Sequence, residues 1–245
     1  MAESSAEEAR ARLLDLAPAG FEEAEGDGAV GFAVYTDAEG EAQIRAVFED
    51  AVSTIVLEGW EDAWREFHRP VRAGPIWIGP SWEQPPFGEL AVVIDPGRAF
   101  GTGAHPTTRL CIELLSIAPR GALLDVGCGS GVLAIAADRL GYRPLLAVDN
   151  DPTAIAVARA NAAVNGVSLE AHLLDATEDT LPPVDVVVAN ILLGVVEDLF
   201  EHLDARFAIT SGYLLGERPR APGWSCIDAR DLDGWAAHLF SRDHR

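Results

Sequence analysis

The sequence predicts an α/β fold: a doubly wound, mostly parallel sheet forms the larger part, and a small α+β module precedes it. From about residue 106, short and nearly all-apolar runs alternate with helical patterns. The runs lack the polar alternation of a strand with one wet face, so both faces should be covered, as in a parallel sheet. Residues 1–62 differ in composition, with 16 acids and 3 arginines, a net charge of −13 against −8 for the rest.

Four apolar runs in the larger part predict its buried strands. They are ALLDVG at 122–127, PLLAVD at 144–149, LEAHLL at 169–174 and DVVVAN at 185–190. One helix is delimited by its end residues: Asp151 can cap its start, Pro152 suits its first turn, and Gly166 can take the left-handed conformation that ends it. This helix should connect the second strand to the third.

The first quarter of the chain has a different pattern. It predicts a helix at 4–17, strands at 20–25 and 29–35, a helix at 39–50 and a strand at 51–59. The following stretch is rich in proline and predicts an irregular connector with short extended pieces such as PIWIGPSW. We therefore expect a small α+β recognition domain at 1–58, a linker at 59–95 and a catalytic domain at 96–245.

Composition limits the class of protein. The 245 residues are 49% hydrophobic and carry a net charge of −21 with no lysine, which excludes a disordered or fibrous chain. The longest apolar stretch, 184–196, is well short of the roughly 20 residues that cross a bilayer. The acidic start lacks the features of a secretory signal, so we expect a cytoplasmic protein that does not contact a membrane. Scattered arginines on an acidic chain argue against nucleic acid as a direct partner.

Cysteine and histidine give no sign of a metal. Cys111, Cys128 and Cys226 are odd in number and far apart, which fits neither a disulfide framework nor a paired zinc site. The six histidines lack metal-ligand spacing. We therefore expect reduced thiols and no metal. No heptad or long apolar edge demands a partner subunit, so we expect a monomer.

A glycine-rich turn follows the first buried strand. Gly127, Gly129 and Gly131 lie where that strand turns into a helix, and glycines let a backbone approach a ligand closely. The next strand ends in Asp149, whose carboxylate can accept hydrogen bonds from both ribose hydroxyls of a nucleoside. A glycine-rich turn can also occur only because it allows tight packing. Here the next strand ends in an acid, which favours a nucleoside cofactor.

The residues of the turn also distinguish between cofactors. Val132 stands where the last glycine of a dinucleotide fingerprint would be, and Asp125 stands two residues before the first glycine. A carboxylate there repels a pyrophosphate but suits a ligand that carries an ammonium group. S-adenosylmethionine has such a group together with a sulfonium, and it is the cofactor we expect.

Longer strings carry a family resemblance. DVGCGSG, AVDNDPTAIAVARANAAVNG and VVVANIL resemble the class I S-adenosylmethionine-dependent methyltransferases. DPGRAFGTGAHPTTRL, at 95–110, resembles the family of ribosomal protein L11 methyltransferases (PrmA) in particular. The resemblance covers 60–193, a little over half of the chain.

The resemblance implies a seven-stranded Rossmann-like methyltransferase sheet ending in a reversed hairpin, after a ferredoxin-like recognition domain and a linker. It implies cofactor contacts at Thr108, Gly127, Asp149 and Asn190, and it places Phe100 in a loop that closes over the methionine end. It also implies methylation of lysine or α-amino nitrogens of ribosomal protein L11, without a metal. With Gly129 and Asp125 from the turn, these are the predicted cofactor-binding residues. The acid-rich first quarter of the chain could in addition attract a basic protein substrate.

The sequence departs from the family pattern in two places, which affects how far the family's substrate recognition and sheet can be expected in this chain. The pattern predicts that the amino-terminal module opens directly into a helix, and we therefore expect it to lack the first strand of a complete ferredoxin-like unit. GERPRAPG, at 216–223, stands where the family has a helix, and its glycine and prolines disfavour one.

Asn190 is the predicted catalytic residue. Methyl transfer to an amine is an in-line displacement that needs an unprotonated, well-oriented nitrogen. The side-chain carbonyl of Asn190 can accept a hydrogen bond from the incoming amine, although the same residue could simply cap the next helix. Ile191 and Leu192 offer no aromatic face for stacking a flipped base, which favours an aliphatic amine. His105 could shuttle protons, but a histidine beside proline before a helix is more often structural.

Other functions stay open at this point. The target could be a lysine of another protein, such as an electron-transfer flavoprotein, or a small amine. The chain could also be a cofactor-binding module without catalysis.

Overall fold

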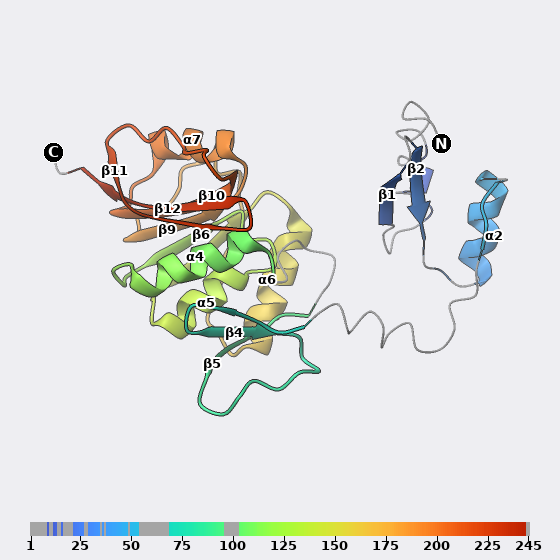
Figure 1. The fold of residues 1–245 in the computed structure, drawn as a ribbon, viewed down its shortest axis with the longest axis horizontal. Helices are drawn as coiled ribbons and strands as arrows, with labels where there is room; N and C mark the ends of the chain where they lie inside the picture. The colour runs from blue at the N-terminus through green and yellow to red at the C-terminus, as the bar shows by residue number, and fades with distance from the viewer. Residues whose placement is uncertain are drawn as a thin grey trace. The chain divides into compact units, whose positions relative to one another are not determined.

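The computed structural model describes residues 9, 12–13, 16, 22–26, 29–34, 36, 38–48, 50–53, 69–95 and 103–243. The chain divides into two compact units, residues 1–63 and 64–245. Each is considered separately (Figure 1).

The first unit holds a hairpin and a helix among its described residues. Strands β1 (Glu22–Gly26) and β2 (Ala29–Ala33) pair antiparallel, and α2 spans Ala38–Val47. Ala9 and Leu13 are buried and helical, which agrees with the helix predicted near the start. The predicted strand at 51–59 is not seen at 51–53, and its remaining residues lie outside the described part of the chain.

The second unit is built on a seven-stranded sheet, as predicted. Its strands are β6 (Leu123–Val126), β7 (Leu145–Asp149), β8 (Glu170–Leu173), β9 (Val186–Asn190), β10 (Phe207–Leu214), β11 (Trp224–Leu232) and β12 (Trp235–Arg242). Their spatial order is β11-β12-β10-β9-β6-β7-β8. The strands from β8 to β10 run parallel, whereas β12 lies antiparallel to both β10 and β11. The doubly wound fold with its reversed hairpin is thus confirmed.

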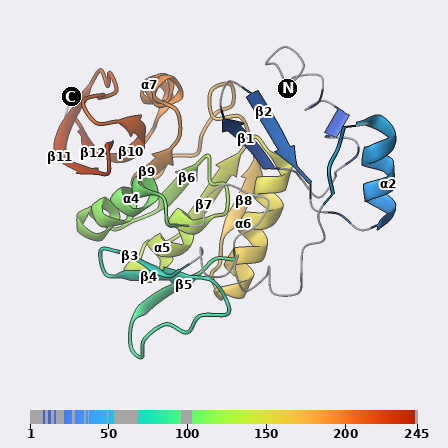
Figure 2. The same cartoon turned by 45° about the vertical axis from the view of Figure 1, so that its right-hand side comes forward.

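Helices cover both faces of this sheet (Figures 1 and 2). On one face lie α4 (Pro106–Ile117), α5 (Val132–Leu140) and α6 (Pro152–Val164), and on the other lies α7 (Leu193–His202). The alternation of side chains along each strand supplies the two cores: Leu123 faces the first layer, and Leu124 faces the second. Covering on both faces explains why β6, β7 and β9 read as nearly unbroken apolar runs. The same prediction is wrong for LEAHLL, because β8 is an edge strand with three of its four residues exposed.

The ends of α6 follow the predicted capping chemistry. The side chain of Asp151 accepts a hydrogen bond from the backbone N–H of Thr153 at 2.7 Å, and Pro152 opens the helix. Gly166, just past the end, has a φ of +66°. In the carboxyl part, residues 215–223 form no helix, as their glycine and prolines predict.

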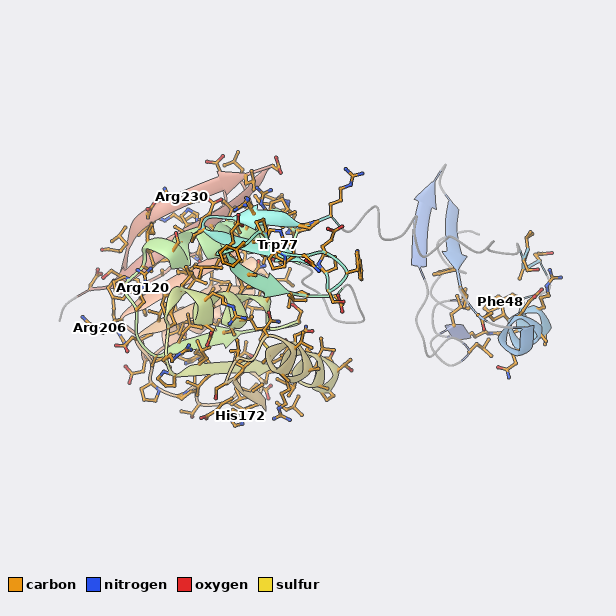
Figure 3. The ribbon with its side chains drawn as sticks, turned by 90° about the horizontal axis from the view of Figure 1, so that it is seen from below. Phe48, Trp77, Arg120, His172, Arg206 and Arg230 are labelled. Atoms are coloured by element: carbon orange, nitrogen blue, oxygen red, sulfur yellow. The ribbon has the colours of Figure 1, made fainter. Side chains whose placement is uncertain are left out.

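Residues 69–95, the described part of the linker predicted at 59–95, form a small sheet in the second unit, and the extended piece predicted at PIWIGPSW contains its middle strand. Strands β3 (Val71–Ala73), β4 (Ile76–Gly79) and β5 (Leu90–Val93) lie in that order, with β4 antiparallel to β3 and parallel to β5. Every residue of β4 is buried, and the small sheet shares one core with α4 and α5. Figure 3 shows Trp77 among the side chains of this sheet. Packing against the helices, which the local sequence does not reveal, orders this stretch.

Candidate active site

The predicted site residues meet where the strand order reverses. Strand β6 has β7 on one side and β9 on the other, and all three run parallel. Their carboxyl ends therefore lie at one edge, where open α/β sheets bind ligands. The glycine turn follows β6, Asp149 ends β7 and Asn190 ends β9.

The turn is held by the neighbouring strand. The backbone N–H groups of Gly127 and Cys128 donate to the carbonyl of Val148 at 2.9 and 3.1 Å. Gly127, Gly129 and Gly131 have φ angles of +68°, +51° and +78°, which side-chain-bearing residues adopt only with strain. The glycines predicted from their spacing are therefore required by the backbone itself.

Asp149 links the turn to the end of β7. One carboxylate oxygen accepts from the N–H of Gly129 at 2.9 Å, and the other accepts from the N–H of Asp151 at 3.0 Å. Each oxygen of a carboxylate can accept more than one hydrogen bond. Asp149 can therefore bind ribose hydroxyls while it holds the turn.

Asp125 lies beneath the turn and is almost fully buried. One of its oxygens accepts from the N–H of Ala134 in the first turn of α5, at 3.0 Å, while the other has no hydrogen-bond partner among the described residues. Burial raises the pKa of this carboxyl to about 7, the Ala134 hydrogen bond opposes the rise, and the charge of Asp149 adds to it. Asp125 therefore has one carboxylate oxygen that could still accept a hydrogen bond or interact with a positive charge.

Asn190 and Thr108, predicted as site residues from separate strings, lie together. The side-chain NH₂ of Asn190 donates to the hydroxyl of Thr108 at 3.3 Å. Thr108 is buried in the first turn of α4, whereas Asn190 is half-buried. With its NH₂ engaged in this way, Asn190 keeps its side-chain carbonyl as an acceptor for another group.

His105 has a structural role in the same loop. It caps α4, with its Nδ1 2.7 Å from the hydroxyl of Thr107, and its ring stands edge-on to Trp235 at 4.9 Å. Its Nδ1 is therefore engaged within the loop. Phe100, predicted to close over the cofactor, lies outside the described residues.

Two features of the site were not predicted from the sequence. The side chain of Ile191 covers Gly127: a Cβ added to that glycine would lie 2.4 Å from Ile191 Cγ2. Gly212, in the middle of β10, lies against the backbone of Ile191. A glycine inside a strand is a recognised signal of a bulge or of a close backbone approach, but it does not name the approaching segment.

The donor set fits the predicted cofactor. Asp125 and Asp149 place two carboxyl groups at the turn, and neither makes an ion pair among the described residues. Such a site favours a cationic ligand with ribose hydroxyls over a pyrophosphate. No group of three potential metal ligands occurs within the part of the chain that the structure describes. There is also no helix among those residues long and apolar enough to cross a membrane.

Comparison with known proteins gives one consistent result. The family model described as "Ribosomal protein L11 methyltransferase (PrmA)" matches residues 29–217. A ribosomal protein L11 methyltransferase of Symbiobacterium thermophilum is 37% identical over 198 residues, covering 74% of this chain and 65% of the relative. One of Azotobacter vinelandii is 46% identical over 208 residues, covering 74% and 70%. The chain thus spans about two thirds of the length of these curated relatives.

A solved structure supports the same assignment. A ribosomal protein L11 methylase from Lactobacillus delbrueckii subsp. bulgaricus superposes with a TM-score of 0.64 at 31% identity. The match covers 72% of this chain and all of the other. The sheet described above is therefore that of an experimentally known fold.

Proposed function

We propose, on the premise that the chain belongs to the PrmA family of ribosomal protein L11 methyltransferases, that it transfers methyl groups to protein amines. The resemblance inferred from the sequence is confirmed, and with it S-adenosylmethionine as the cofactor. The acceptor, the lysine or α-amino chemistry and the partner are part of the proposal. We propose ribosomal protein L11 as the substrate, in the cytoplasm, for a monomeric enzyme that does not bind nucleic acid directly.

The observation that carries this proposal is the position of Asn190. It ends β9 beside the glycine turn, and its NH₂ is held by Thr108. Its carbonyl can therefore accept a hydrogen bond from an amine and orient the nitrogen lone pair. A fixed acceptor beside the cofactor turn supports amine methylation more than a binding module without catalysis.

The cofactor supplies an electrophilic methyl group on its sulfonium when it is bound. Asp149 and the turn would hold its ribose, and Asp125 would provide negative potential for its cationic end. These residues would hold the donor in a fixed orientation toward the amine.

The chain's contribution to the reaction is mainly positioning. A free lysine amine with a pKa of about 10.4 is about 3.4 units from its neutral form at pH 7, which corresponds to about 4.6 kcal/mol. An apolar slot lowers this cost because it disfavours the ammonium. Ile191 and Leu192 follow Asn190: Ile191 packs over Gly127 of the turn, and Leu192 is an exposed apolar side chain that could line such a slot once a substrate is bound. No strong general base is required, since the proton is lost to solvent before attack.

Charge supports a basic protein as the partner. The whole chain carries −21, and more than half of this excess lies in residues 1–62. Complementary charge speeds the encounter of two proteins more than it adds affinity. A basic protein substrate fits this negative charge better than an acidic one.

The test is methyl incorporation from labelled S-adenosylmethionine into purified L11, with mass spectrometry of the product. We expect labelled lysine or α-amino nitrogens on L11 and no label on a variant of L11 that lacks the mapped amines. If another protein of a whole soluble extract is labelled and L11 is not, the substrate is a different protein, but amine methylation remains the reaction. Cofactor binding without any transfer would make the chain a binding module.

A further inference from the structure

Strand β10 contains a bulge at Gly212, directly beside the end of β9. The pairing with β12 passes from Ser211↔Ala237 to Tyr213↔Ala236, so Gly212 is an extra residue on its strand. Its φ is +103°. The bulge therefore turns a glycine backbone, with no side chain, toward whatever lies next to it.

The neighbour of Gly212 is the peptide that follows Asn190. A Cβ added to Gly212 would lie 2.1 Å from the carbonyl oxygen of Ile191, 2.7 Å from its carbonyl carbon and 2.9 Å from its nitrogen. All three atoms belong to the backbone, which cannot move aside as a flexible side chain can. Any larger residue at Gly212 must therefore displace Ile191 and, through it, Asn190.

Ile191 is held from two further sides. Its N–H donates to the carbonyl of Ser211 at 3.1 Å, which ties it to the residue before the bulge. On the other side, its Cγ2 atom leaves no room for a Cβ on Gly127 in the cofactor turn. Ile191 thus lies between the bulge and the turn. The positions of the bulge and the turn together fix the position of Asn190, the residue before Ile191.

A buried polar cluster secures the far end of the bulge. The hydroxyl of Tyr213 lies 3.0 Å from the carbonyl of Thr210, 2.9 Å from the hydroxyl of Thr210 and 2.9 Å from Nδ1 of His238. The rings of Tyr213 and His238 are stacked at 5.7 Å. Because Tyr213 and Thr210 stand on either side of Gly212, their hydrogen bonds span the bulge and fix its shape.

We propose that Gly212 and Tyr213 are positioning residues for methyl transfer, acting through Ile191 on the Asn190 acceptor. The inference rests on the proposed amine methylation and deepens it. In-line transfer depends steeply on geometry: a misplacement of about 1 Å can cost about 100-fold in rate. A bulge that sets the place of Asn190 controls the rate without touching either reactant.

The first experiment compares two glycine variants in the full-length protein. Gly212→Ala adds a Cβ into the Ile191 backbone, whereas the control Gly216→Ala adds one at a φ of +92° with no atom within 4 Å. Both variants carry backbone strain, so their difference isolates the contact. We expect kcat of Gly212→Ala to fall about 100-fold below that of the control. The dissociation constant of S-adenosylmethionine, measured by calorimetry, should stay within about threefold, because Asp149 and its hydrogen bonds are unchanged.

A second pair of variants covers the case in which Gly212→Ala does not fold. Tyr213→Phe removes the hydroxyl that spans the bulge, and its control, Tyr142→Phe, removes the hydroxyl of a fully buried tyrosine that donates to the carbonyl of Leu115 at 2.8 Å. Both should lose similar stability. Only Tyr213→Phe should lower kcat, about tenfold at unchanged cofactor affinity, and speed hydrogen exchange in the peptide that contains the Ile191 amide.

The outcomes separate this inference from the proposed function. A wild-type protein that methylates no amine overturns the function, and the exchange measurement alone then decides whether Tyr213 orders the Ile191 peptide. A wild-type protein that is active, with both test variants matching their controls in kcat and in exchange, overturns the positioning role and leaves the function intact. A loss of cofactor affinity equal to the loss of kcat also overturns it, because the bulge would then act on the cofactor turn instead.

Discussion

The buried carboxyl of Asp125 gives the protein a pH dependence that one substitution should remove. Burial raises the pKa of Asp125 from 3.8 to about 7 in the folded state. Between these two values the folded protein binds a proton that the unfolded chain has released, so stability falls as pH rises. The stabilisation is fully present below pH 4 and is lost as pH rises toward 7.

The size of the effect follows from the two pKa values. A shift from 3.8 to about 7 corresponds to about 4 kcal/mol over the whole range, at 1.36 kcal/mol per unit. About 2 to 3 kcal/mol of this falls between pH 5 and pH 8, because part of the difference already arises below pH 5. This amount is large against a typical domain stability of about 5 to 15 kcal/mol.

The assay is urea unfolding of the wild type and of Asp125→Asn at pH 5 and pH 8. The amide oxygen of asparagine can still accept from Ala134, so the variant removes the charge and keeps the hydrogen bond. We expect Asp125→Asn to gain about 2 to 3 kcal/mol relative to the wild type on going from pH 5 to pH 8. Because 38 other acids also titrate, only this difference between the two proteins is informative.

Asp175→Asn is the matched control. Hydrogen bonds from the side chain and backbone of Thr177 lower the pKa of Asp175, so its carboxyl is ionised in both states above pH 5. Any stability it contributes is present above its unfolded pKa and is lost only as pH falls through its folded value. The control should therefore run parallel to the wild type from pH 5 to pH 8. Parallel curves for Asp125→Asn as well would refute a buried, uncompensated carboxyl beneath the turn.

Three further substitutions test the site and the core. Asp149→Ala should weaken cofactor binding by about 1.5 to 3 kcal/mol, since charged hydrogen bonds to the ribose are lost together with the anchor of Gly129; unchanged affinity by calorimetry would exclude Asp149 from the pocket. Asn190→Ala should reduce kcat far more than cofactor affinity, and a fully active variant would leave Asn190 only a structural role. Phe200→Ala should cost about 3 to 5 kcal/mol in thermal or urea unfolding, because the ring packs edge-on against Trp224 and Phe240 in the core beneath α7; a loss below 1 kcal/mol would contradict that packing.

The fold could be predicted where its cause is local. Strands β6, β7 and β9 could be predicted from apolar runs because both of their faces are covered. Helix α6 begins and ends at residues whose capping chemistry is visible in the sequence. The site residues could be predicted for a related reason: parallel strands bring their carboxyl ends to one edge, so Asp149 and Asn190 had to lie near the turn.

The small sheet shows how far local reasoning reaches: the extended piece at PIWIGPSW was predicted, but the sheet that it forms was not. Prolines between 69 and 95 indicated an irregular linker, yet they stand outside the strands: Pro75 and Pro80 flank β4, and the others lie between β4 and β5 or before β3. Proline therefore marks the ends of these strands, as its missing N–H requires, and does not prevent them. What orders them is burial against α4 and α5, which begin at residues 106 and 132 and so lie outside the stretch itself.

The glycines of the site also differ in whether their role could be predicted from the sequence. Gly127, Gly129 and Gly131 could be interpreted from sequence because their spacing repeats within five residues and follows a strand, so turn and function share one local signal. Gly212 carries a comparable constraint, but the atoms that impose it belong to Ile191, 21 positions earlier and on another strand. The sequence FAITSGYL shows that a strand contains a glycine, and only the pairing of β10 with β9 shows which backbone needs the space. The position of the Asn190 side chain therefore depends on Gly212, and the sequence alone does not show this dependence.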